Sequence, residues 1–460
     1  MIVDAVRQAV AEIERGVADG NVVPHVTCDE IRAHLDSRYD FAAPQPLESV
    51  VADVEGMMRR WHVQVTHPRY FGLFNPSVTT ASVVADTLTA AYNPQLASWR
   101  TSPAANEIER HTLRWVAARF GFPRAASATF TAGGAESNQS AVVLALTRAY
   151  SNYGDEGLRA ISGRPTIYLS HDAHDSFNKV AHVTGLGRGS LRRVGVDRDR
   201  RMDIADLARQ VVEDRRNGWS PLMVVGTAGT TAAGAIDPLR AMARFCRSHG
   251  LWFHVDAAWG GAAILVPGLR PHLDGIDAAD SISCDAHKWL SVPMGAGMFF
   301  CRHPRIVSEA FRAATAYMPP PAGEATVDPY ASSLQWSRRF IGLKLFLALA
   351  EHGEHGYAAL IERQVRMGDA LRAALRRDGW TIVNDTPLPL VCFTRDGLDT
   401  RAFLPELYRR QAAWISEARL SDGEPVLRAC ITSFRTTPAD IERAVAEMTR
   451  TALESCEVHI

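Results

Sequence analysis

Lysine is nearly absent from this sequence. Arginine supplies most of its 50 basic residues, and the only lysines are Lys179, Lys288 and Lys344. A reaction that requires a lysine amine therefore has three candidates at most.

An excess of charge of one sign is also missing. The 50 basic residues stand against 51 acidic ones, and the net charge at pH 7 is −1. Nucleic acids and anionic membranes are bound through basic surfaces. We therefore expect neither of them as a partner.

Long apolar runs and paired cysteines do not occur. The sequence has no run of 18 uncharged apolar residues, so no transmembrane helix is expected. Its cysteines form no C-x-x-C pair and are odd in number, which disfavours a zinc site and a disulfide framework. They are Cys28, Cys246, Cys284, Cys301, Cys392, Cys430 and Cys456. We expect a cytoplasmic protein without a bound metal.

The N-terminal segment has the pattern of a helix. Acidic residues interrupt its apolar runs, which is not typical of a signal peptide. Val3, Val6, Val10, Ile13 and Val17 fall at helical spacing and predict an amphipathic helix. Helical patterns broken by prolines continue through residues 1–75, which we interpret as an N-terminal helical segment.

Short apolar runs then alternate with helix-length segments. This alternation is typical of buried parallel strands joined by right-handed crossovers. We predict an α/β domain over residues 76–345, with a mainly parallel central sheet and helices on both faces. Its expected strands are SATFTAG (127–133), TIYLSH (166–171), LMVVGTAG (222–229), LWFHVDAA (251–258), DSISCDAH (280–287) and GMFFCR (297–302).

The remaining sequence predicts a smaller α+β domain over residues 346–460. Long helical patterns come first, and then TIVND, LVCFT and VLRACITSF are expected as strands. A proline- and glycine-rich segment at 318–326, MPPPAGEAT, predicts a mobile loop.

Three constellations carry chemistry. The first is TFTAGGAES, where a strand ends, two glycines turn the chain and a helix begins. Exposed N–H groups at such a helix start can bind an anion. A tight turn without a ligand is the alternative explanation of this pattern. Asp256 ends an apolar strand, where a buried carboxylate needs a donor or a cation. Lys288 follows another strand, and a desolvated lysine has a lowered pKa that suits a Schiff base.

Taken together, the three suggest one cofactor. A helix N-terminus can take a phosphate, an aspartate can hold a ring nitrogen and a lysine can form an imine. These are the contacts that pyridoxal 5′-phosphate (PLP) requires.

The chain resembles the group II PLP-dependent amino-acid decarboxylases, a branch of the aspartate-aminotransferase-like fold (PLP-dependent transferase fold type I). Residues 281–302 match the lysine signature of that family at each specified position: Ser281, a bulky apolar residue, five free residues, Lys288, Trp289-Leu290, Met294, Ala296, Phe299 and Arg302. The likeness covers most of residues 60–350 through THPRYFG (66–72), ASWRTSPAANEIER (97–110), SHDAHDSFNKVA (170–181), GTAGTTAAGAIDPL (226–239) and SRRFIGLKLF (337–346). It implies an L-amino-acid decarboxylase with an amino-acid substrate, forming a homodimer whose N-terminal helices wrap the partner subunit.

The resemblance implies a role for each matching residue. Lys288 would carry the cofactor, Asp256 would pair with its ring nitrogen, and His174 would stack on the ring. Around them, the phosphate, ring-edge and imine surroundings would come from Gly134, Ala135, Thr227, Ala258, Ser281, Asp285 and His287.

Tyr317 lies 29 positions after Lys288, just before the proline-rich loop. In the decarboxylases a tyrosine at this offset reaches the neighbouring subunit's site and gives a proton to the substrate Cα. Relatives that make aldehydes often lack this tyrosine or the stacking histidine, and this chain has both.

Four residues are candidates for substrate contacts: Phe74, Asn75, Trp99 and Arg100. In aromatic amino-acid decarboxylases the residues before the Trp99 position are apolar and pack on a ring, whereas here they read Gln-Leu-Ala. This difference weakens the case for a catechol or indole substrate. Arg100 would suit an acidic side chain, and a salt bridge to Glu107 is an equal alternative.

Two other functions remain open at this point. The first keeps PLP but changes the reaction to an aldehyde synthase or an aminotransferase, whose carboxylate-binding arginine would be Arg428 or Arg435. The second is a non-catalytic protein on the same fold, which the presence of Lys288, Asp256 and His174 disfavours.

Overall fold

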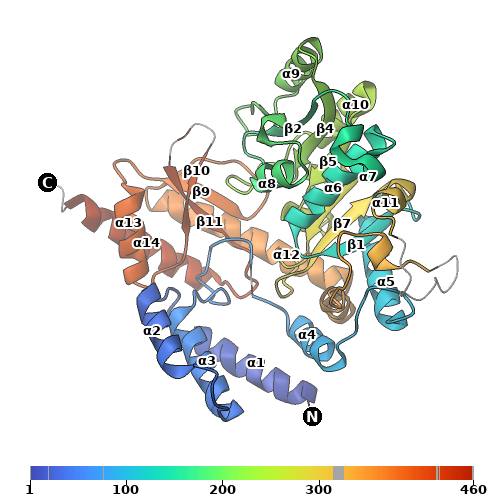
Figure 1. Cartoon of the computed structure of the whole chain (residues 1–460). Helices are drawn as coiled ribbons and strands as arrows, with labels where there is room; N and C mark the ends of the chain where they lie inside the picture. Colours follow the sequence, from blue (N-terminus) through green and yellow to red (C-terminus); the bar gives the residue numbers. More distant parts are fainter. Residues whose placement is uncertain are drawn as a thin grey trace.

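The computed structural model describes residues 2–18, 20–75, 77–313, 326–420, 423 and 425–457. Figure 1 shows two parts that lie next to each other: a large sheet with its helices, and a small sheet with helices α13 and α14. Helices α1, α2 and α3 lie below the small sheet in this view. Within the described ranges, the helices fall short of the length and apolarity needed to cross a bilayer.

The N-terminal part is helical, as its sequence pattern predicts. Its helices are α1 (Ile2–Ala18), α2 (Cys28–Arg38) and α3 (Leu47–Trp61). Helix α2 begins in a capping box, in which the Thr27 hydroxyl accepts from the Glu30 N–H at 3.2 Å and the Glu30 carboxylate accepts from the Thr27 N–H at 2.7 Å.

The large part is built on seven strands. They are β1 (Ser127–Thr131), β2 (Pro165–Ser170), β3 (Leu191–Val194), β4 (Ser220–Thr227), β5 (Trp252–Asp256), β6 (Ser281–Asp285) and β7 (Gly297–Cys301), in the spatial order β1-β7-β6-β5-β4-β2-β3. The pairs among β3, β2, β4, β5 and β6 are parallel, whereas β7 is antiparallel to both β6 and β1. The link from β6 to β7 is too short for a crossover, so the chain must return antiparallel, and this link contains Lys288.

Helices surround this sheet. They are α4 (Thr80–Tyr92), α5 (Pro103–Arg119), α6 (Gly134–Ala149), α7 (Tyr153–Glu156), α8 (Ser176–Val183), α9 (Ile204–Arg216), α10 (Leu239–His249) and α11 (Pro304–Ala310). The five residues of β5 are all buried, as expected for a central strand with both faces covered.

Helix α12 (Leu343–Arg377) runs between the two sheets and bends at Gly353, whose φ is 63° (Figure 1). Beyond it lie β8 (Thr381–Ile382), β9 (Leu390–Thr394), α13 (Thr400–Arg409), β10 (Ser416–Arg419), β11 (Pro425–Cys430) and α14 (Pro438–Glu457). The four strands pair antiparallel in the order β10-β11-β9-β8. The two sheets thus fall inside the ranges 76–345 and 346–460, and the exact domain limits remain our interpretation.

Two strands, β3 and β10, were not predicted from the sequence, and the reason is the same for both. Strand β3 reads LRRV and lies at the edge of the large sheet, and β10 reads SEAR at the edge of the small one. Edge strands carry charged side chains that break the apolar pattern.

Strand β7 and the turn after β1 approach each other so closely that a side chain at Gly297 would not fit. A Cβ on Gly297 would lie 2.6 Å from the Gly133 Cα and 2.8 Å from its nitrogen. We expect Gly297→Ala to displace the glycine turn, to lower the free energy of unfolding by about 1–3 kcal/mol and to weaken PLP binding, because overpacking shifts the backbone.

Denaturant unfolding and a PLP titration measure both effects. Gly154→Ala is the matched control, since no atom lies within 4 Å of the added methyl group. A Gly297→Ala protein with the unfolding free energy and PLP affinity of the wild type would show that this close approach is unimportant.

Candidate active site

The carboxyl ends of the parallel strands form one cavity. Strands β4 and β5 end at Thr227 and Asp256, and the turn after β1 leads into α6 at Gly134. Ligands bind at this edge of open α/β sheets. The cavity is lined by Phe74, Gly134, Ala135, Asn138, His174, Thr227, Gly229, Thr231, Asp256, Ala258, Trp259 and Lys288.

Asp256 is a buried carboxylate with a full set of donors. The Asn138 amide donates to its Oδ2 at 2.9 Å, and its Oδ1 accepts from the Ala258 N–H at 3.1 Å and from the Ser283 hydroxyl at 3.2 Å. Burial alone raises the pKa of a carboxyl, but the positive charge of Lys288 and these donors outweigh it and hold the pKa of Asp256 below its usual value. The group is therefore a fixed negative charge on the cavity wall.

Lys288 lies beside a second carboxylate. Its Nζ is 3.1 Å from Oδ2 of Asp285, and its side chain is 22% exposed. The same Nζ lies 5.7 Å from the centre of the Phe74 ring. The neighbouring Trp289 is fully buried and donates its indole N–H to Gln364 of α12, which anchors the lysine loop in the core.

The start of α6 approaches this pair. The Gly134 N–H donates to Oδ2 of Asp285 at 3.1 Å, and a Cβ on Gly134 would lie 3.1 Å from the Ala258 Cβ. His287 flanks the turn, because a Cβ on Gly133 would lie 3.3 Å from its ring. Burial lowers the pKa of His287, whose Nδ1 accepts from the Ala296 N–H at 3.0 Å. The imidazole is therefore neutral, with its hydrogen on Nε2.

His174 and Thr227 complete the part of the cavity that the sequence predicted. His174 is exposed at the rim, and its Nδ1 accepts from the Ser176 N–H at 3.1 Å. The Thr227 hydroxyl is buried and has no hydrogen-bond partner among the described residues.

Ser281 lies elsewhere. The sequence placed it in the phosphate and imine surroundings, but its hydroxyl contacts Nδ1 of His254 at 2.9 Å and accepts from the Trp252 indole at 2.9 Å. It occupies the first position of β6, whereas the cavity lies at the other end of that strand. Its side chain therefore contacts His254 of β5 and not the cavity.

Three of the four substrate candidates also stand apart from the cavity. Phe74 lines it and packs on Trp259 with ring centres 4.6 Å apart. Asn75 instead accepts from the Tyr70 hydroxyl at 2.9 Å, and the Trp99 indole donates to Glu107 at 3.0 Å. Arg100 is not part of the cavity wall.

The two arginines of the small domain have different surroundings. Arg428 is buried, donates from Nε to the Thr231 carbonyl at 2.8 Å and lies 4.8 Å from the Phe74 ring centre. Its Nη2 has no hydrogen-bond partner among the described residues. Arg435 forms an ion pair with Glu14 of α1, so of the two only Arg428 lies against a cavity residue, Phe74. Tyr317 lies outside the described residues.

Asn138, Thr231 and Trp259 were not predicted. Asn138 could have been found, since it lies one helical turn after Gly134 and residues at that spacing share a face. Thr231 carries no comparable signal, because only the fold of its loop brings it to the cavity.

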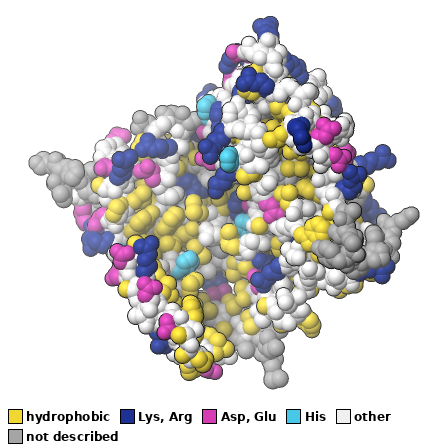
Figure 2. Space-filling view, viewed as in Figure 1, with side chains coloured by type: hydrophobic (Ala, Val, Ile, Leu, Met, Phe, Trp, Pro, Cys, Tyr) yellow, Lys and Arg dark blue, Asp and Glu magenta, His cyan; other side chains and the backbone are white. Residues whose placement is uncertain are grey.

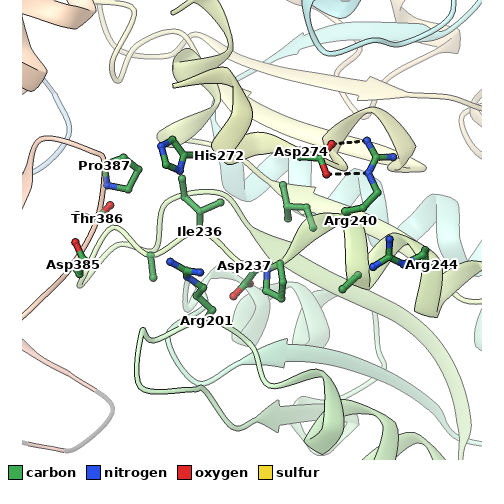
Figure 3. A pocket seen from close by; sticks show the side chains of 14 residues that line it. Arg201, Ile236, Asp237, Arg240, Arg244, His272, Asp274, Asp385, Thr386 and Pro387 are labelled. Atoms are coloured by element: carbon green, nitrogen blue, oxygen red, sulfur yellow. Dashed lines mark hydrogen bonds and ion pairs between the residues drawn. The ribbon is translucent and has the colours of Figure 1, made fainter. Parts of the chain in front are cut away.

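A wider pocket lies outside this site. Figure 3 shows its arginine and aspartate side chains, with Arg240 paired to Asp274. The Nη2 atom of Arg240 lies 2.8 Å from Oδ1 of Asp274. Asp237 belongs to it and accepts the Thr227 N–H at 2.8 Å, so it fixes the backbone of a cavity residue from behind. Burial raises the pKa of Asp237 to about 7. Among the described residues, no group of three or more His, Cys, Asp or Glu side chains is placed to hold a metal ion.

Comparison with known proteins agrees with this geometry. The family model described as pyridoxal-dependent decarboxylase conserved domain matches residues 30–395. The chain belongs to this family. It is thus a PLP-dependent carboxy-lyase, and the fold predicted from the sequence is confirmed.

The individual relatives are identical to this chain at about a quarter of the aligned residues. Aromatic-L-amino-acid decarboxylase of Bacillus atrophaeus is 27% identical over 390 residues, which cover 82% of this chain and 79% of the relative. Phenylacetaldehyde synthase of a Rosa hybrid cultivar is 26% identical over 359 residues, which cover 76% and 70%. The crystal structure of mouse CSAD in apo form has a TM-score of 0.89 at 25% identity and covers 98% of this chain and 99% of its own.

The residues of the cavity fit PLP. The Gly134 N–H is engaged by Asp285, so the next residue at the start of α6, Ala135, is the one whose backbone suits the phosphate, and Asp256 suits a protonated ring nitrogen. Two buried polar atoms beside the cavity, Thr227 Oγ1 and Asp285 Oδ1, have no partner among the described residues, and a polar cofactor would supply one. Lys288 is the one lysine that lines the cavity.

Lys288→Ala should abolish covalent attachment of PLP and all turnover, because no other side chain of the cavity has an amine. Borohydride reduction followed by peptide mass analysis measures the attachment. Lys179→Ala is the matched control, since this lysine lies exposed on α8. Cofactor trapped on Lys179 or Lys344 would overturn the assignment.

Proposed function

We propose that this protein removes the carboxylate of an L-amino acid as CO₂ and releases the amine. The observation that carries the proposal is the pairing, in one cavity, of the buried ionised Asp256 with the amine of Lys288. When it is bound, PLP supplies an electron sink for the electron pair left at the substrate Cα.

The side chains divide the work. Asp256 would accept a hydrogen bond from the ring nitrogen and keep a proton there. Lys288 would hold the cofactor through its amine and serve as an acid and base near the substrate Cα. His174, at the cavity rim, would cover the cofactor and exclude water. Tyr317 donates a proton from its hydroxyl to Cα.

The aldehyde synthase is the nearest alternative, because the relatives include both decarboxylases and phenylacetaldehyde synthases at similar identity. The presence of both Tyr317 and His174 supports the amine outcome. Arg428 favours an aminotransferase as a further alternative, since it lies beside Phe74 and its Nη2, which has no hydrogen-bond partner in the described part of the chain, suits a carboxylate.

A screen of amino acids that measures CO₂, amine and peroxide together tests the proposal. We expect one substrate class to give CO₂ and amine in equal amounts with no peroxide. Amino-group transfer to a keto acid without CO₂ would identify an aminotransferase, and peroxide equal to CO₂ would identify an aldehyde synthase.

Tyr317→Phe should preserve CO₂ release while amine formation slows by about 10²–10⁴-fold, the range for loss of a positioned general acid. The unprotonated carbon would then react with oxygen and give aldehyde, ammonia and peroxide. Tyr92→Phe is the matched control, because Tyr92 is 83% exposed and lies outside the cavity. Amine that still equals CO₂ at the wild-type rate would remove Tyr317 from this role and make His174 the next candidate.

We also propose that the protein acts as a homodimer through its N-terminal helices. Leu47, Val51, Val54 and Met58 form an exposed apolar stripe along α3, and Phe41 beside it is 89% exposed. Figure 2 shows hydrophobic side chains over this lower-left part of the molecule. Apolar stripes of this kind mark association surfaces, and the ion pair of Arg435 with Glu14 ties α1 to the small domain beside it.

Light scattering should give the mass of two chains. Val51→Glu combined with Met58→Glu should give monomers of low activity, because burying two carboxylates in an apolar contact is unfavourable. Val212→Glu, on the exposed face of α9, is the control and should stay dimeric. A fully active monomer would refute the proposal.

A further inference from the structure

A chain of buried polar side chains leads away from Asp256 into the core. Asn138 Nδ2 donates to Asp256 at 2.9 Å, and Asn138 Oδ1 lies 3.0 Å from Nε2 of His254. On the other side of the imidazole, Nδ1 lies 2.9 Å from the Ser281 hydroxyl, which accepts from the Trp252 indole at 2.9 Å. These side chains are all buried, and none but Asp256 and Asn138 lines the cavity.

The two ends of the chain fix the direction of every hydrogen bond. The Asp256 carboxylate only accepts, so Asn138 must turn its NH₂ toward it and its carbonyl oxygen toward His254. That oxygen also only accepts, so His254 must carry a hydrogen on Nε2. The Trp252 indole only donates, so the Ser281 oxygen accepts from it. Among the described residues, Nδ1 of His254 is the acceptor placed for the Ser281 hydrogen, and the hydroxyl therefore donates to it. His254 is thereby set as the neutral Nε2–H tautomer.

We propose that His254 is a positioning residue, whose Nε2–H locks the Asn138 amide in the one orientation that presents a donor to Asp256. This inference rests on the proposed role of Asp256 at the cofactor ring. The flipped amide would place its oxygen against the Asp256 carboxylate. That contact repels the negative charge and favours the protonated acid, which no longer accepts a hydrogen bond from the ring nitrogen.

The surroundings of His254 support a neutral ring. Burial lowers its pKa, and this effect outweighs the attraction of Asp256 and the interaction with the Ser281 backbone, both of which raise it. Phe177 packs against it in an edge-type ring contact, with ring centres 6.3 Å apart. A fully buried imidazole with both nitrogens satisfied does not need water, so it can hold the amide with little motion.

The tautomer can be observed without cofactor or substrate. ¹⁵N NMR of the full-length apo protein labelled at histidine should show His254 protonated at Nε2 only and not titrating down to about pH 5, and its signal is assigned by its loss in His254→Gln. A hydrogen on Nδ1, or titration near the ordinary pKa of about 6.5, would overturn the proposal.

PLP affinity then tests the consequence. We expect His254→Leu to raise the Kd for PLP by about 10- to 100-fold, the range for losing a hydrogen bond that supports a charged group. His254→Gln should restore most of the affinity, because the glutamine amide can donate from nearly the same place as Nε2.

Phe177→Leu is the matched control for packing, since it disturbs the same contact without removing a hydrogen bond. It should bind PLP within a few-fold of the wild type. Equal losses in His254→Gln, His254→Leu and Phe177→Leu would show a role in packing only. If no amino acid yields CO₂, the proposed reaction fails, while the tautomer and the PLP affinities still decide the role of His254.

Discussion

The ionised state of the buried Asp256 carboxylate is the constraint on which the site depends. Removing a carboxylate from water is costly, and a protein tolerates it only where donors and a cation replace the water. Here the replacements come from three separate places: Asn138 on α6, Ser283 on β6, and the turn at Ala258. The glycine turn, the short link to β7 and the burial of β5 all serve to bring these donors to one point. A lost donor would thus affect both stability and cofactor binding.

The sequence predicted those parts of the molecule that depend on local pattern. Asp256, Lys288 and Gly134 follow apolar strands, and the carboxyl ends of such strands meet at one sheet edge, so their convergence could be anticipated. Strands β3 and β10 could not, because their charged edge residues hide the period. The prediction that Ser281 lies near the cofactor was wrong for a different reason. The motif match did not show that Ser281 begins β6, whereas the cavity lies where that strand ends. The position of Arg428 could not be predicted either, because its guanidinium is held by the carbonyls of Gly72 and Thr231, which are distant in sequence.

The reaction outcome depends on fewer groups than the cofactor does. Decarboxylases and aldehyde synthases among the relatives match this chain at similar identity, so overall sequence likeness does not separate the two activities. What separates them in our account is whether a proton reaches Cα before oxygen does. We propose that Tyr317 and His174 act at that step. Phe74, which lines the cavity, and Arg428, which lies 4.8 Å from the Phe74 ring centre, would instead bear on which substrate enters.

The protonation state of the cofactor ring tests the central claim most directly. The ¹⁵N chemical shift of the ring nitrogen in ¹⁵N-labelled PLP, bound to the full-length protein, reports whether that nitrogen carries a proton. An ionised Asp256 predicts a protonated nitrogen in the wild type well above the pH at which free PLP loses this proton. The same shift should move to the unprotonated value in Asp256→Asn. An unprotonated nitrogen in the wild type, or identical shifts in both proteins, would contradict the account.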